Sequence, residues 1–471
     1  MAKLHEECGI FGIWDPNGNP AGTTYYGLIA LQHRGQEGSG IAVNRDREIF
    51  HHKDLGLVND VFNEESLSKL QGSMAVGHVR ASACGENLRE NVQPLVLRYI
   101  KGSLAISHNG SIINTAELKK DLEQTGAIFQ TTSDTEIIAY LIARERTKVG
   151  SIELAVKNAM KMLKGAFSLI VMSPNKLIAA RDPLGFRPLC LGKRNEAIIF
   201  ASETCAFDAV DAEFVRDIEP GEIVVLENGE LRSDKELCGN KASLCIFEHI
   251  YFARPDSIID GEIVHECRKR AGAFLAQQSP VEADIVIGVP DSGLSAAQGY
   301  AEYSGIPFDT GFIKNRYIGR TFIKPEQSQR ETAVRLKLNV LKSAVAGKRV
   351  VMVDDSIVRG TTCARIVNLL REAGAKEVHV RISSPEFIWP CFFGTDIPSR
   401  DVLISTSHTI EETAEIIHAD SLDYLSLENL YKIAPASKCA FCDACFTGKY
   451  SVDVDHLLND EDRECLKQLN K

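Results

Sequence analysis

The fold of the second half of the chain is decided by the stretch Val350-Val351-Met352-Val353-Asp354-Asp355-Ser356-Ile357-Val358-Arg359-Gly360-Thr361-Thr362. Its first four residues are continuously apolar, which is typical of a strand in a parallel sheet that helices cover on both faces. Two carboxylates end this strand, and a short loop leads to hydroxyl groups at the start of a predicted helix. Backbone N–H groups at a helix N-terminus can hold a phosphate, and paired carboxylates suit sugar hydroxyls or Mg²⁺. The stretch therefore predicts a phosphate site. Two adjacent acids that end a buried strand are costly unless they are paired, and a bound sugar or metal ion would pair them.

Two other segments fit such a site. The apolar strand expected over 285–289 ends in Pro290-Asp291-Ser292-Gly293, a small hydroxyl-bearing turn that could hold pyrophosphate or its metal. The segment 314–320 carries three cations around a glycine, as a mobile clamp over a leaving pyrophosphate would require. Taken alone, this second segment reads better as a solvated basic loop.

The apolar strand, the paired acids and the Gly-Thr-Thr turn resemble the phosphoribosyl pyrophosphate (PRPP) signature of the phosphoribosyltransferases. The resemblance implies a type I phosphoribosyltransferase domain built on a parallel sheet. It also implies Mg²⁺ at Ser292, Asp354 and Asp355. The PRPP-binding residues that it implies are Lys314, Arg316, Arg320, Asp354, Asp355, Arg359, Gly360, Thr361 and Thr362.

Near the start of the chain, Cys8 opens an apolar stretch that continues to Trp14, behind the charged segment Met1–Glu7. If that segment is removed, Cys8 becomes the N-terminal residue. A terminal cysteine carries its own base, because an α-amino group with a pKa of about 7.7–8.0 lies beside the thiol. A buried strand cysteine is the alternative interpretation, and it would be favoured from position alone.

The first half also holds the groups that a cysteine nucleophile needs in order to bind and cleave an amide. Arg80 could pair with a substrate α-carboxylate, Asp134 could accept an α-ammonium, and Asn109-Gly110 could donate to an oxyanion. With Cys8-Gly9-Ile10-Phe11-Gly12 and the stretch 32–40, these segments resemble, in order, the glutaminase domain of the N-terminal-nucleophile (Ntn) amidotransferases. The resemblance implies an αββα Ntn-hydrolase sandwich, Cys8, Asn109 and Gly110 as catalytic residues, and Arg34, Arg80 and Asp134 as glutamine-binding residues.

One position departs from the pattern of these amidotransferases. The resemblance predicts an aromatic residue after Arg80, whereas this chain has Ala81, with Ala83-Cys84 following. We expect the packing of the glutamine pocket to differ at this point. A void there would raise KM for glutamine, and the Ala81→Tyr variant would then have a different KM.

Taken together, the two halves from Cys8 to about Tyr450 resemble the glutamine PRPP amidotransferase family. The resemblance implies hydrolysis of glutamine, internal passage of ammonia and displacement of pyrophosphate from PRPP, which gives phosphoribosylamine in the first step of de novo purine synthesis. It also implies feedback inhibition by AMP, GMP or their diphosphates, and a homotetramer. The expected domains are a propeptide (1–7), a glutaminase domain (8–235), a phosphoribosyltransferase domain (242–450) and a C-terminal tail (451–471).

A cluster of cysteines near position 440 is the strongest metal signal by spacing. Cys439, Cys442 and Cys445 follow the C-x₂-C-x₂-C pattern of ferredoxins, and a fourth ligand would come from elsewhere. Zinc is the open alternative, since four thiolates suit it equally well. The chain also resembles the iron–sulfur, propeptide-bearing class of the family, which implies a structural [4Fe–4S] cluster in the second domain. Its implied ligands are Cys245, Cys391, Cys442 and Cys445, without Cys439.

Composition limits the remaining possibilities. The 471 residues are 44% hydrophobic and 25% charged, which is typical of soluble globular proteins, and the length favours two domains. The net charge of −11 argues against nucleic acid as a main partner. We find no secretory signal and no apolar run long enough for a membrane span, so we expect a cytoplasmic protein. Thirteen cysteines in such a chain do not predict a disulfide framework.

Hydrophobic periodicity predicts the elements around these motifs. Helices are expected over 23–34 and 136–144, and the segment beyond Pro398 is expected to be helical apart from the cysteine cluster. The polar stretch 233–241 is the candidate domain boundary. Strands are expected over 73–79, 104–107, 167–172, 197–200, 223–226, 285–289 and 350–353.

Two other functions remain as alternatives. The chain could be a PRPP-binding regulatory protein, although such a protein would need no glutaminase nucleophile. It could also be a free glutaminase with a degenerate second domain. The dependence of glutamine hydrolysis on PRPP distinguishes these functions from the amidotransferase.

Overall fold

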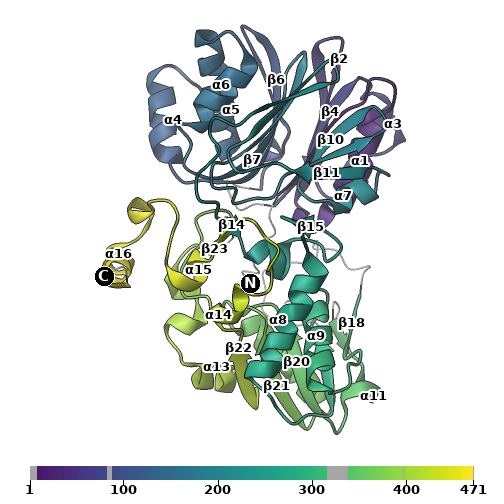
Figure 1. Ribbon diagram of the computed structural model, residues 1–471, viewed down its shortest axis with the longest axis vertical. Coiled ribbons are helices and arrows are strands. Elements are labelled where there is room, and N and C mark those ends of the chain that lie inside the picture. Colours follow the sequence, from purple (N-terminus) through teal and green to yellow (C-terminus); the bar gives the residue numbers. More distant parts are fainter. Residues whose placement is uncertain (1–7, 82–86, 316–337, 396, 470–471) are drawn as a thin grey trace.

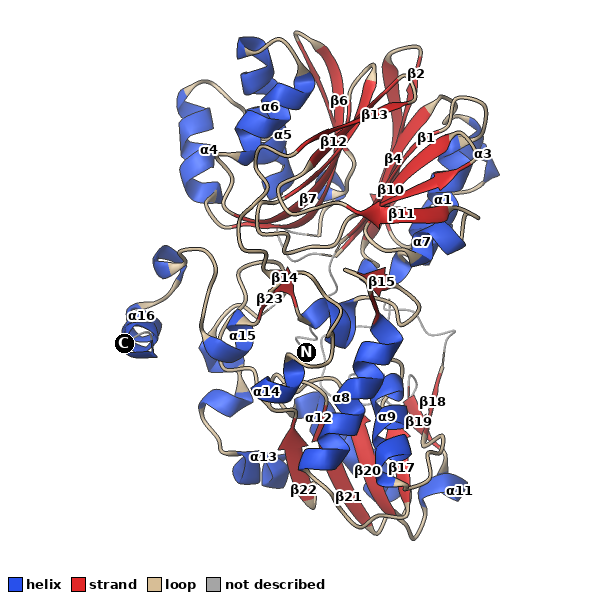
Figure 2. Cartoon of the chain, in the orientation of Figure 1, coloured by secondary structure: helices blue, strands red, loops and turns tan. Residues whose placement is uncertain are grey.

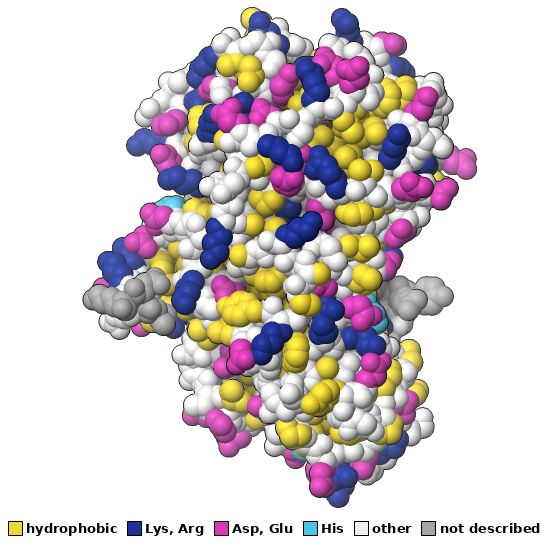
Figure 3. Space-filling model, in the orientation of Figure 1, with side chains coloured by type: hydrophobic (Ala, Val, Ile, Leu, Met, Phe, Trp, Pro, Cys, Tyr) yellow, Lys and Arg dark blue, Asp and Glu magenta, His cyan; other side chains and the backbone are white. Residues whose placement is uncertain are grey.

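The computed structural model describes residues 8–81, 87–315, 338–395 and 397–469. Figure 1 shows two lobes. The first lobe, at the top, is formed by the first half of the chain, and the second lobe, below it, by the second half. The C-terminal segment, drawn in yellow, passes beside the junction of the two lobes and ends in α16. On the face drawn in Figure 3, basic and acidic side chains are intermingled.

The upper lobe contains two antiparallel sheets that pack face to face, with helices on both outer sides (Figure 2). The first sheet has the order β11 (Glu213–Asp217), β9 (Cys190–Arg194), β10 (Ala197–Ala201), β1 (Gly9–Trp14), β4 (Met74–Arg80), β2 (Gly38–Arg45) and β3 (Glu48–Leu55). The second has the order β13 (Glu230–Asp234), β12 (Ile223–Glu227), β8 (Lys176–Arg181), β7 (Gly165–Met172), β6 (Gly102–Ile112) and β5 (Leu95–Tyr99).

Alternation along the strands separates the layers of this lobe. Ile10 of β1 and Ala105 of β6 belong to the apolar core between the two sheets. Phe11 of β1 faces the opposite way, into the core beneath the helices of the first sheet, and Leu104 of β6 does the same beneath those of the second. The helices are α1 (Pro20–Ala30), α2 (Val58–Val61), α3 (Glu64–Ser68) and α7 (Cys205–Asp208) by the first sheet, and α4 (Thr115–Gln124), α5 (Asp134–Lys148) and α6 (Ile152–Met160) by the second. This lobe is an αββα sandwich, as the sequence predicts.

The lower lobe is built on a parallel sheet with the order β17 (Ile285–Gly288), β20 (Arg349–Asp354), β21 (Glu377–Ile382) and β22 (Ser421–Tyr424). Both faces are covered, because Val351 packs into one apolar core and Val350 into another. The first core includes α8 (Val264–Gln278) and α9 (Leu294–Ser304), and the second includes α12 (Thr361–Glu372) and α13 (Ile410–Ile416). This arrangement is the α/β fold that the apolar strands predict.

Short elements complete the second half of the chain. They are β14 (Leu244–Cys245), β15 (Ile258–Ile259), β16 (Glu262–Ile263), β18 (Phe312–Lys314), β19 (Leu338–Val340), α11 (Lys342–Val345), α14 (Leu427–Leu430), β23 (Phe441–Cys442), α15 (Ala444–Thr447) and α16 (Asp460–Leu469). No helix in the described ranges is both long and apolar enough to cross a membrane.

Two element predictions need correction. The segment beyond Pro398 is not entirely helical outside the cysteine cluster, because β22 adds a fourth strand to the parallel sheet. Its alternating residues are typical of an edge strand, and they give a weaker signal than the apolar central strands. The helix expected over 23–34 begins earlier, at Pro20, because the Asn19 side chain accepts a hydrogen bond from Gly22 N and caps it. This helix ends at Ala30, and a separate 3₁₀ turn spans Gln32–Arg34.

Candidate active site

Cys8 lies directly before β1, at the edge of the space between the two sheets of the first lobe, which we call the inter-sheet layer. In the β1–β4 register Ile10 stands opposite His78, so the next pair along the strands on the same face is Cys8 and Arg80. This face looks toward the second sheet, because His78 Nε2 lies 3.1 Å from the carbonyl oxygen of His108 on β6. The Cys8 thiol donates to the carbonyl of Ala81 at 3.5 Å. The register therefore places Cys8 and Arg80 side by side.

Asn109 faces the same layer from the opposite sheet. It lies four residues after Ala105 on β6, and residues an even number apart on a strand point to the same face. Its side chain is fully buried, and neither its amide nitrogen nor its amide oxygen has a hydrogen-bond partner among the described residues. Buried polar atoms without partners are rare in folded proteins and call for an explanation such as a missing ligand. Gly110 follows with φ +136°, and a Cβ there would come within 2.1 Å of the Ala166 oxygen, so only glycine fits.

Asp134 begins α5, close to the end of β6. Its carboxylate accepts a hydrogen bond from Ile112 N at 3.1 Å and lies 3.5 Å from His108 Nδ1. Burial would raise the pKa of Asp134, but His108 and the neighbouring N–H groups outweigh burial and hold it below its usual value. The group is therefore a charged carboxylate, as an ammonium-binding residue must be.

Arg80 and Arg34 have different surroundings. Arg80 is almost fully buried, donates to Asn87 Oδ1 at 3.2 Å and lies 3.7 Å from a carboxylate oxygen of Glu37. Arg34 is also buried, but its guanidinium contacts the Cys8 carbonyl and two carboxylates, those of Glu203 and Glu248. The structure thus brings Arg34 behind the Cys8 backbone. Its role as a glutamine-binding residue stays a prediction.

The predicted phosphate loop joins β20 to α12. Gly360 precedes the helix with φ +74°, and Thr361 and Thr362 form its first turn. Asp354 Oδ1 accepts a hydrogen bond from Asp355 N at 2.9 Å, and Asp355 is buried while Arg359 is exposed. The loop lies at the carboxyl edge of the parallel sheet, where ligands bind in open α/β folds.

The turn at Ser292-Gly293 lies against this loop. A Cβ on Gly293 would come within 2.4 Å of the Val353 oxygen, so the turn packs directly on the end of β20. Lys314 Nζ contacts Asp291 at 2.5 Å, which joins the predicted clamp to the same turn. The structure thus brings Ser292, Lys314 and the phosphate loop to one region, whereas Arg316 and Arg320 lie outside the described residues.

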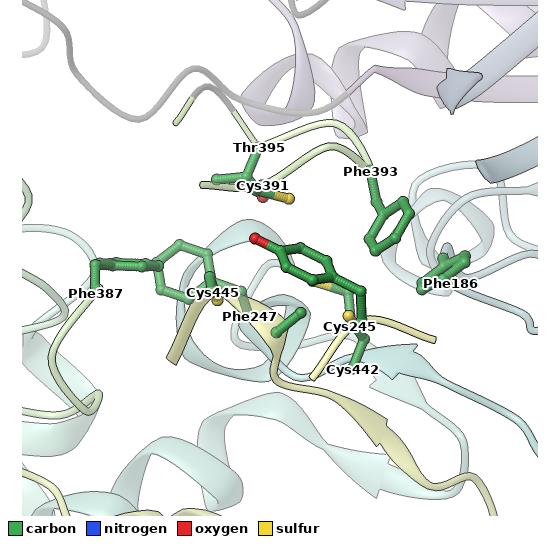
Figure 4. Close-up of a pocket in the computed structure, with 11 residues that line it drawn as sticks. Phe186, Cys245, Phe247, Phe387, Cys391, Phe393, Thr395, Cys442 and Cys445 are labelled. Carbon is green, nitrogen blue, oxygen red and sulfur yellow. The ribbon is translucent and has the colours of Figure 1, made fainter. Parts of the chain in front are cut away.

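A third constellation lies where the two lobes meet. The parallel pair β14–β23 places Cys245 opposite Cys442, and the N–H groups of Ile388 and Trp389 donate to the Cys445 carbonyl. Figure 4 shows the side chains that surround the cavity so formed. Its lining consists of Phe186, Cys245, Phe247, Phe387, Cys391, Phe393, Thr395, Cys442, Ala444, Cys445 and Tyr450. These four cysteines are the ones implied by the resemblance, and Cys439 is not part of the lining.

The four thiols surround this cavity without converging on one point. Across the described ranges, no group of three or more His, Cys, Asp or Glu side chains is arranged to hold a single metal ion. Burial raises the pKa of Cys442 well above its usual value, and the neighbouring thiols of Cys245 and Cys391 add to this effect.

Comparison with known proteins agrees with both lobes. Residues 78–209 match the model of the glutamine amidotransferase domain, and residues 261–383 match that of the phosphoribosyl transferase domain. The amidophosphoribosyltransferase of Bacillus subtilis is 51% identical over 96% of this chain and 95% of its own length. The chain belongs to the amidophosphoribosyltransferase family. The enzyme of Methanocaldococcus jannaschii is 50% identical over 95% of this chain and 98% of its own.

Solved structures of the family have the same fold. The B. subtilis glutamine PRPP amidotransferase complexed with ADP and GMP has a TM-score of 0.89 and 50% identity, and covers 96% of this chain and 98% of its own. A structure described as the allosteric regulatory enzyme of purine biosynthesis also has a TM-score of 0.89, with 49% identity over 96% of this chain and 97% of its own. As an amidophosphoribosyltransferase, this protein uses glutamine to aminate PRPP in purine synthesis. The match covers both domains, so the regulatory protein and the free glutaminase are no longer needed as alternatives.

Three functional candidates escaped the sequence analysis. Glu203, Glu248 and Arg187 are buried. Both glutamates pair with Arg34, and Arg187 connects Glu248 to the Phe393 carbonyl at the cysteine-lined cavity. Their signal is a charged residue inside an apolar run, as Glu248 is within 245–252. Such a residue must be paired in the folded protein, but the sequence does not say with which partner.

Proposed function

We propose that Cys8, exposed by removal of residues 1–7, is the nucleophile that hydrolyses glutamine. Its α-amino group takes the thiol proton, the sulfur attacks the amide carbon, and the amine returns the proton to the nitrogen as the C–N bond breaks and ammonia leaves. Water then hydrolyses the γ-glutamyl thioester, which releases glutamate and restores the Cys8 thiol. Asn109 and Gly110 donate to the oxyanion of the tetrahedral intermediate. The observation that carries this proposal is the buried Asn109 amide, which has no partner within the described part of the chain and faces the same layer as Cys8.

The ends of glutamine are bound by charges on either side of this centre. Arg80 pairs with the α-carboxylate, and its position beside Cys8 in the strand register supports this role. Asp134 accepts the α-ammonium, supported by the low pKa that keeps it charged. Arg34 is retained as a candidate glutamine-binding residue, although its described contacts support a role behind the Cys8 peptide.

The second site binds PRPP at the loop between β20 and α12. Thr361, Thr362 and the helix N-terminus hold the 5-phosphate, with Gly360 and Arg359 completing the loop. Asp354 and Asp355 bind ribose hydroxyls and, with Ser292, are suited by their oxygen atoms to Mg²⁺, which when bound would neutralise the pyrophosphate. Lys314, Arg316 and Arg320 close over the pyrophosphate and exclude water, which would otherwise compete with ammonia.

We further propose that Cys245, Cys391, Cys442 and Cys445 hold a [4Fe–4S] cluster. A zinc ion with Zn–S bonds of about 2.3 Å would draw its four sulfurs onto one point. The described thiols of all four cysteines line one aromatic-walled cavity, and this shared lining supports a single group bound by the four. Anaerobically purified protein should be brown and contain about four iron and four sulfide per chain. Colourless protein with a single zinc per chain would overturn the proposal.

Glutamate release by N-terminally processed protein, measured with Mg²⁺ and with or without PRPP, tests the two sites together. We expect stimulation by PRPP and loss of release in Cys8→Ala, while ammonium-dependent synthesis of phosphoribosylamine persists. Release by Cys8→Ala at the wild-type rate would refute the role of Cys8. Glutamate release at the same rate with and without PRPP would refute the coupling of the two sites.

Feedback by purine nucleotides and a homotetramer complete the proposal. The solved B. subtilis relative is complexed with ADP and GMP, which supports nucleotide binding by this chain as well. A nucleotide carries the same ribose 5-phosphate as PRPP, so one of them would occupy the loop at Thr361. Inhibition by GMP that is competitive with PRPP is the expected result, and light scattering gives the oligomeric state.

A further inference from the structure

A buried network of four charged side chains connects Cys8 to the second lobe. Arg34 and Glu203 come from the first lobe, and Glu248 comes from the second, three residues after Cys245. Arg187 joins the network through Glu248 at 3.4 Å. All four side chains have 0% exposure, and their formal charges sum to zero. We call these residues the interlobe quartet.

Arg34 is held at every side of its guanidinium. Its Nη1 and Nη2 donate to the two carboxylate oxygens of Glu248 at 3.0 and 2.8 Å, which is a bidentate pair. Nη1 also donates to Glu203 Oε1 at 2.6 Å. The remaining donor of the guanidinium, Nε, donates to the Cys8 carbonyl at 3.1 Å. Because a guanidinium is planar and rigid, fixing its two ends on carboxylates also fixes the third donor.

Both carboxylates belong to the contact between the lobes. Glu203 Oε2 accepts hydrogen bonds from Arg254 N at 2.9 Å and from Ser257 Oγ at 2.6 Å, and both of these residues belong to the second lobe. Burial would lower the pKa of Arg34, but Glu248 and Glu203 raise it well above its usual value, so Arg34 stays charged. The orientation of Arg34 is therefore fixed by the second lobe as well as by the first.

The other end of the quartet reaches the cysteine-lined cavity. Arg187 Nη2 donates to the Phe393 carbonyl at 2.7 Å. The ring of Phe393 stacks on Phe186 at 4.3 Å, and both rings line the cavity. One continuous set of hydrogen bonds thus leads from this wall through Arg187, Glu248 and Arg34 to the peptide of Cys8.

We propose that Glu248 is a positioning residue for glutamine hydrolysis, acting through Arg34 on the Cys8 carbonyl. The Cys8–Gly9 peptide is closely packed, since a Cβ on Gly9 would meet Val79 Cγ2 at 2.8 Å. A hydrogen bond to its carbonyl therefore controls the direction of the Cys8 amine and thiol. The second lobe in this way orients the nucleophile of the first. The inference rests on the proposed role of Cys8.

The test separates positioning from folding and from substrate binding. In Glu248→Gln the charge on Arg34 is only partly balanced, and kcat for glutamine hydrolysis should fall about 10–100-fold, as expected for a misplaced nucleophile. KM for glutamine should stay within about twofold, because Glu248 contacts Arg34, and in the positioning role Arg34 holds the Cys8 carbonyl and does not contact the substrate. Glu222→Gln is the matched control, since Glu222 is equally buried and paired with Arg216 but lies outside the quartet.

A second variant guards against misfolding. Arg34→Met with Glu248→Met removes one positive and one negative charge, while Glu203 keeps its hydrogen bonds from Arg254 N and Ser257 and Arg187 keeps its bond to the Phe393 carbonyl. Urea unfolding of this double variant measures what the loss of the ion pairs costs in stability, so that kcat is compared only on folded protein. The double variant also removes the donor to the Cys8 carbonyl, so the same loss of kcat is expected. Labelling of Cys8 by a diazoketone analogue of glutamine should slow in parallel, whereas alkylation by iodoacetamide, which needs no orientation, should not.

The outcomes are distinguishable. Wild-type kcat in the double Met variant would overturn the inference, and a rise in KM with unchanged kcat would do so too. If Cys8→Ala measured alongside still hydrolyses glutamine, the proposed function itself fails. Loss of hydrolysis in Cys8→Ala with full kcat in the double variant would refute only the role of Glu248.

Discussion

At the scale of single residues, the site is marked by polar side chains that burial has left without partners or has shifted in pKa. Asn109 lacks partners for both amide atoms among the described residues, and His78 is fully buried at the same layer. Folding alone gains nothing from the Asn109 amide, because its desolvation is offset by no hydrogen bond among the described residues, and His78 has a partner at Nε2 but none at Nδ1. Their presence is consistent with a layer arranged for a substrate.

The Asn109→Ala variant should separate stability from activity. Its free energy of unfolding should change by less than about 1 kcal/mol, because the lost amide is unpaired in the free protein. Loss of an oxyanion donor should lower kcat for glutamine hydrolysis about 100–1,000-fold. Steady-state glutamate release and urea unfolding measure the two effects. Hydrolysis within threefold of wild type would contradict the oxyanion role.

His78 predicts a pH dependence of stability. Burial, above all, lowers its pKa from 6.5 to about 3. Between these values the unfolded chain binds a proton that the folded chain does not, so the folded state loses stability as pH falls below 6.5. The loss reaches about 1.4 kcal/mol per pH unit.

The control for this prediction is His78→Gln, whose amide can donate to the His108 carbonyl but does not titrate. The difference in unfolding free energy between the two proteins should therefore shift in favour of the variant as the pH is lowered from 7 to 4.5. Parallel pH profiles for wild type and variant would show that His78 does not carry the effect.

At the scale of elements, the sequence predicted the strands and loops well where burial is two-sided. The stretch 350–362 specified β20, its terminal acids and the start of α12, because an apolar strand and a glycine turn have few alternatives. The edge strand β22 was missed because only every second residue in it is apolar, which is a weaker indication of a strand than the continuous apolar runs of the central strands. Long-range pairs such as Arg34–Glu248 were missed as well, since nothing local indicates which charges meet.

The loop before α12 depends on Gly360. Its φ of +74° is left-handed, and a Cβ there would come within 2.7 Å of Ile404 Cδ1. Gly360→Ala should cost about 1–2 kcal/mol of stability and raise KM for PRPP about tenfold, as the strained loop shifts the N–H groups of Thr361. Gly305, at the end of α9, has the same φ but open space around it. Gly305→Ala should therefore lose similar stability without a change in KM, and equal KM values for the two variants would contradict the prediction.

At the scale of the whole molecule, the lobes are joined by a shared apolar core as well as by the interlobe quartet. Ile113 of the first lobe packs in one cluster with Trp389 and Cys442 of the second and with Leu458 of the C-terminal segment. His456 of that segment also lies 3.2 Å from the Ile113 carbonyl. The C-terminal segment thus packs against both the cysteine-lined cavity and the first lobe.

This packing predicts that the C-terminal segment protects the proposed cluster. Leu458 is 6% exposed, whereas its neighbour Leu457 is 38% exposed. Leu458→Ala should destabilise the segment by about 2–5 kcal/mol and let oxygen reach the cluster several times faster. The decay of visible absorption in air measures this rate. Leu457→Ala should match the wild type, and equal decay in both variants would contradict the prediction.

The pairing of β14 with β23 has a consequence for how the protein is made. Cys245 leaves the ribosome before any strand of the parallel sheet, whereas Cys442 leaves it after the last one, β22. The two cysteines meet only when the intervening chain has been translated and folded back on itself. A polypeptide that stalls anywhere within the second lobe therefore has no complete set of thiols to offer. Acquisition of the proposed cluster would then act as a checkpoint in biogenesis, one that only fully translated, correctly folded molecules pass.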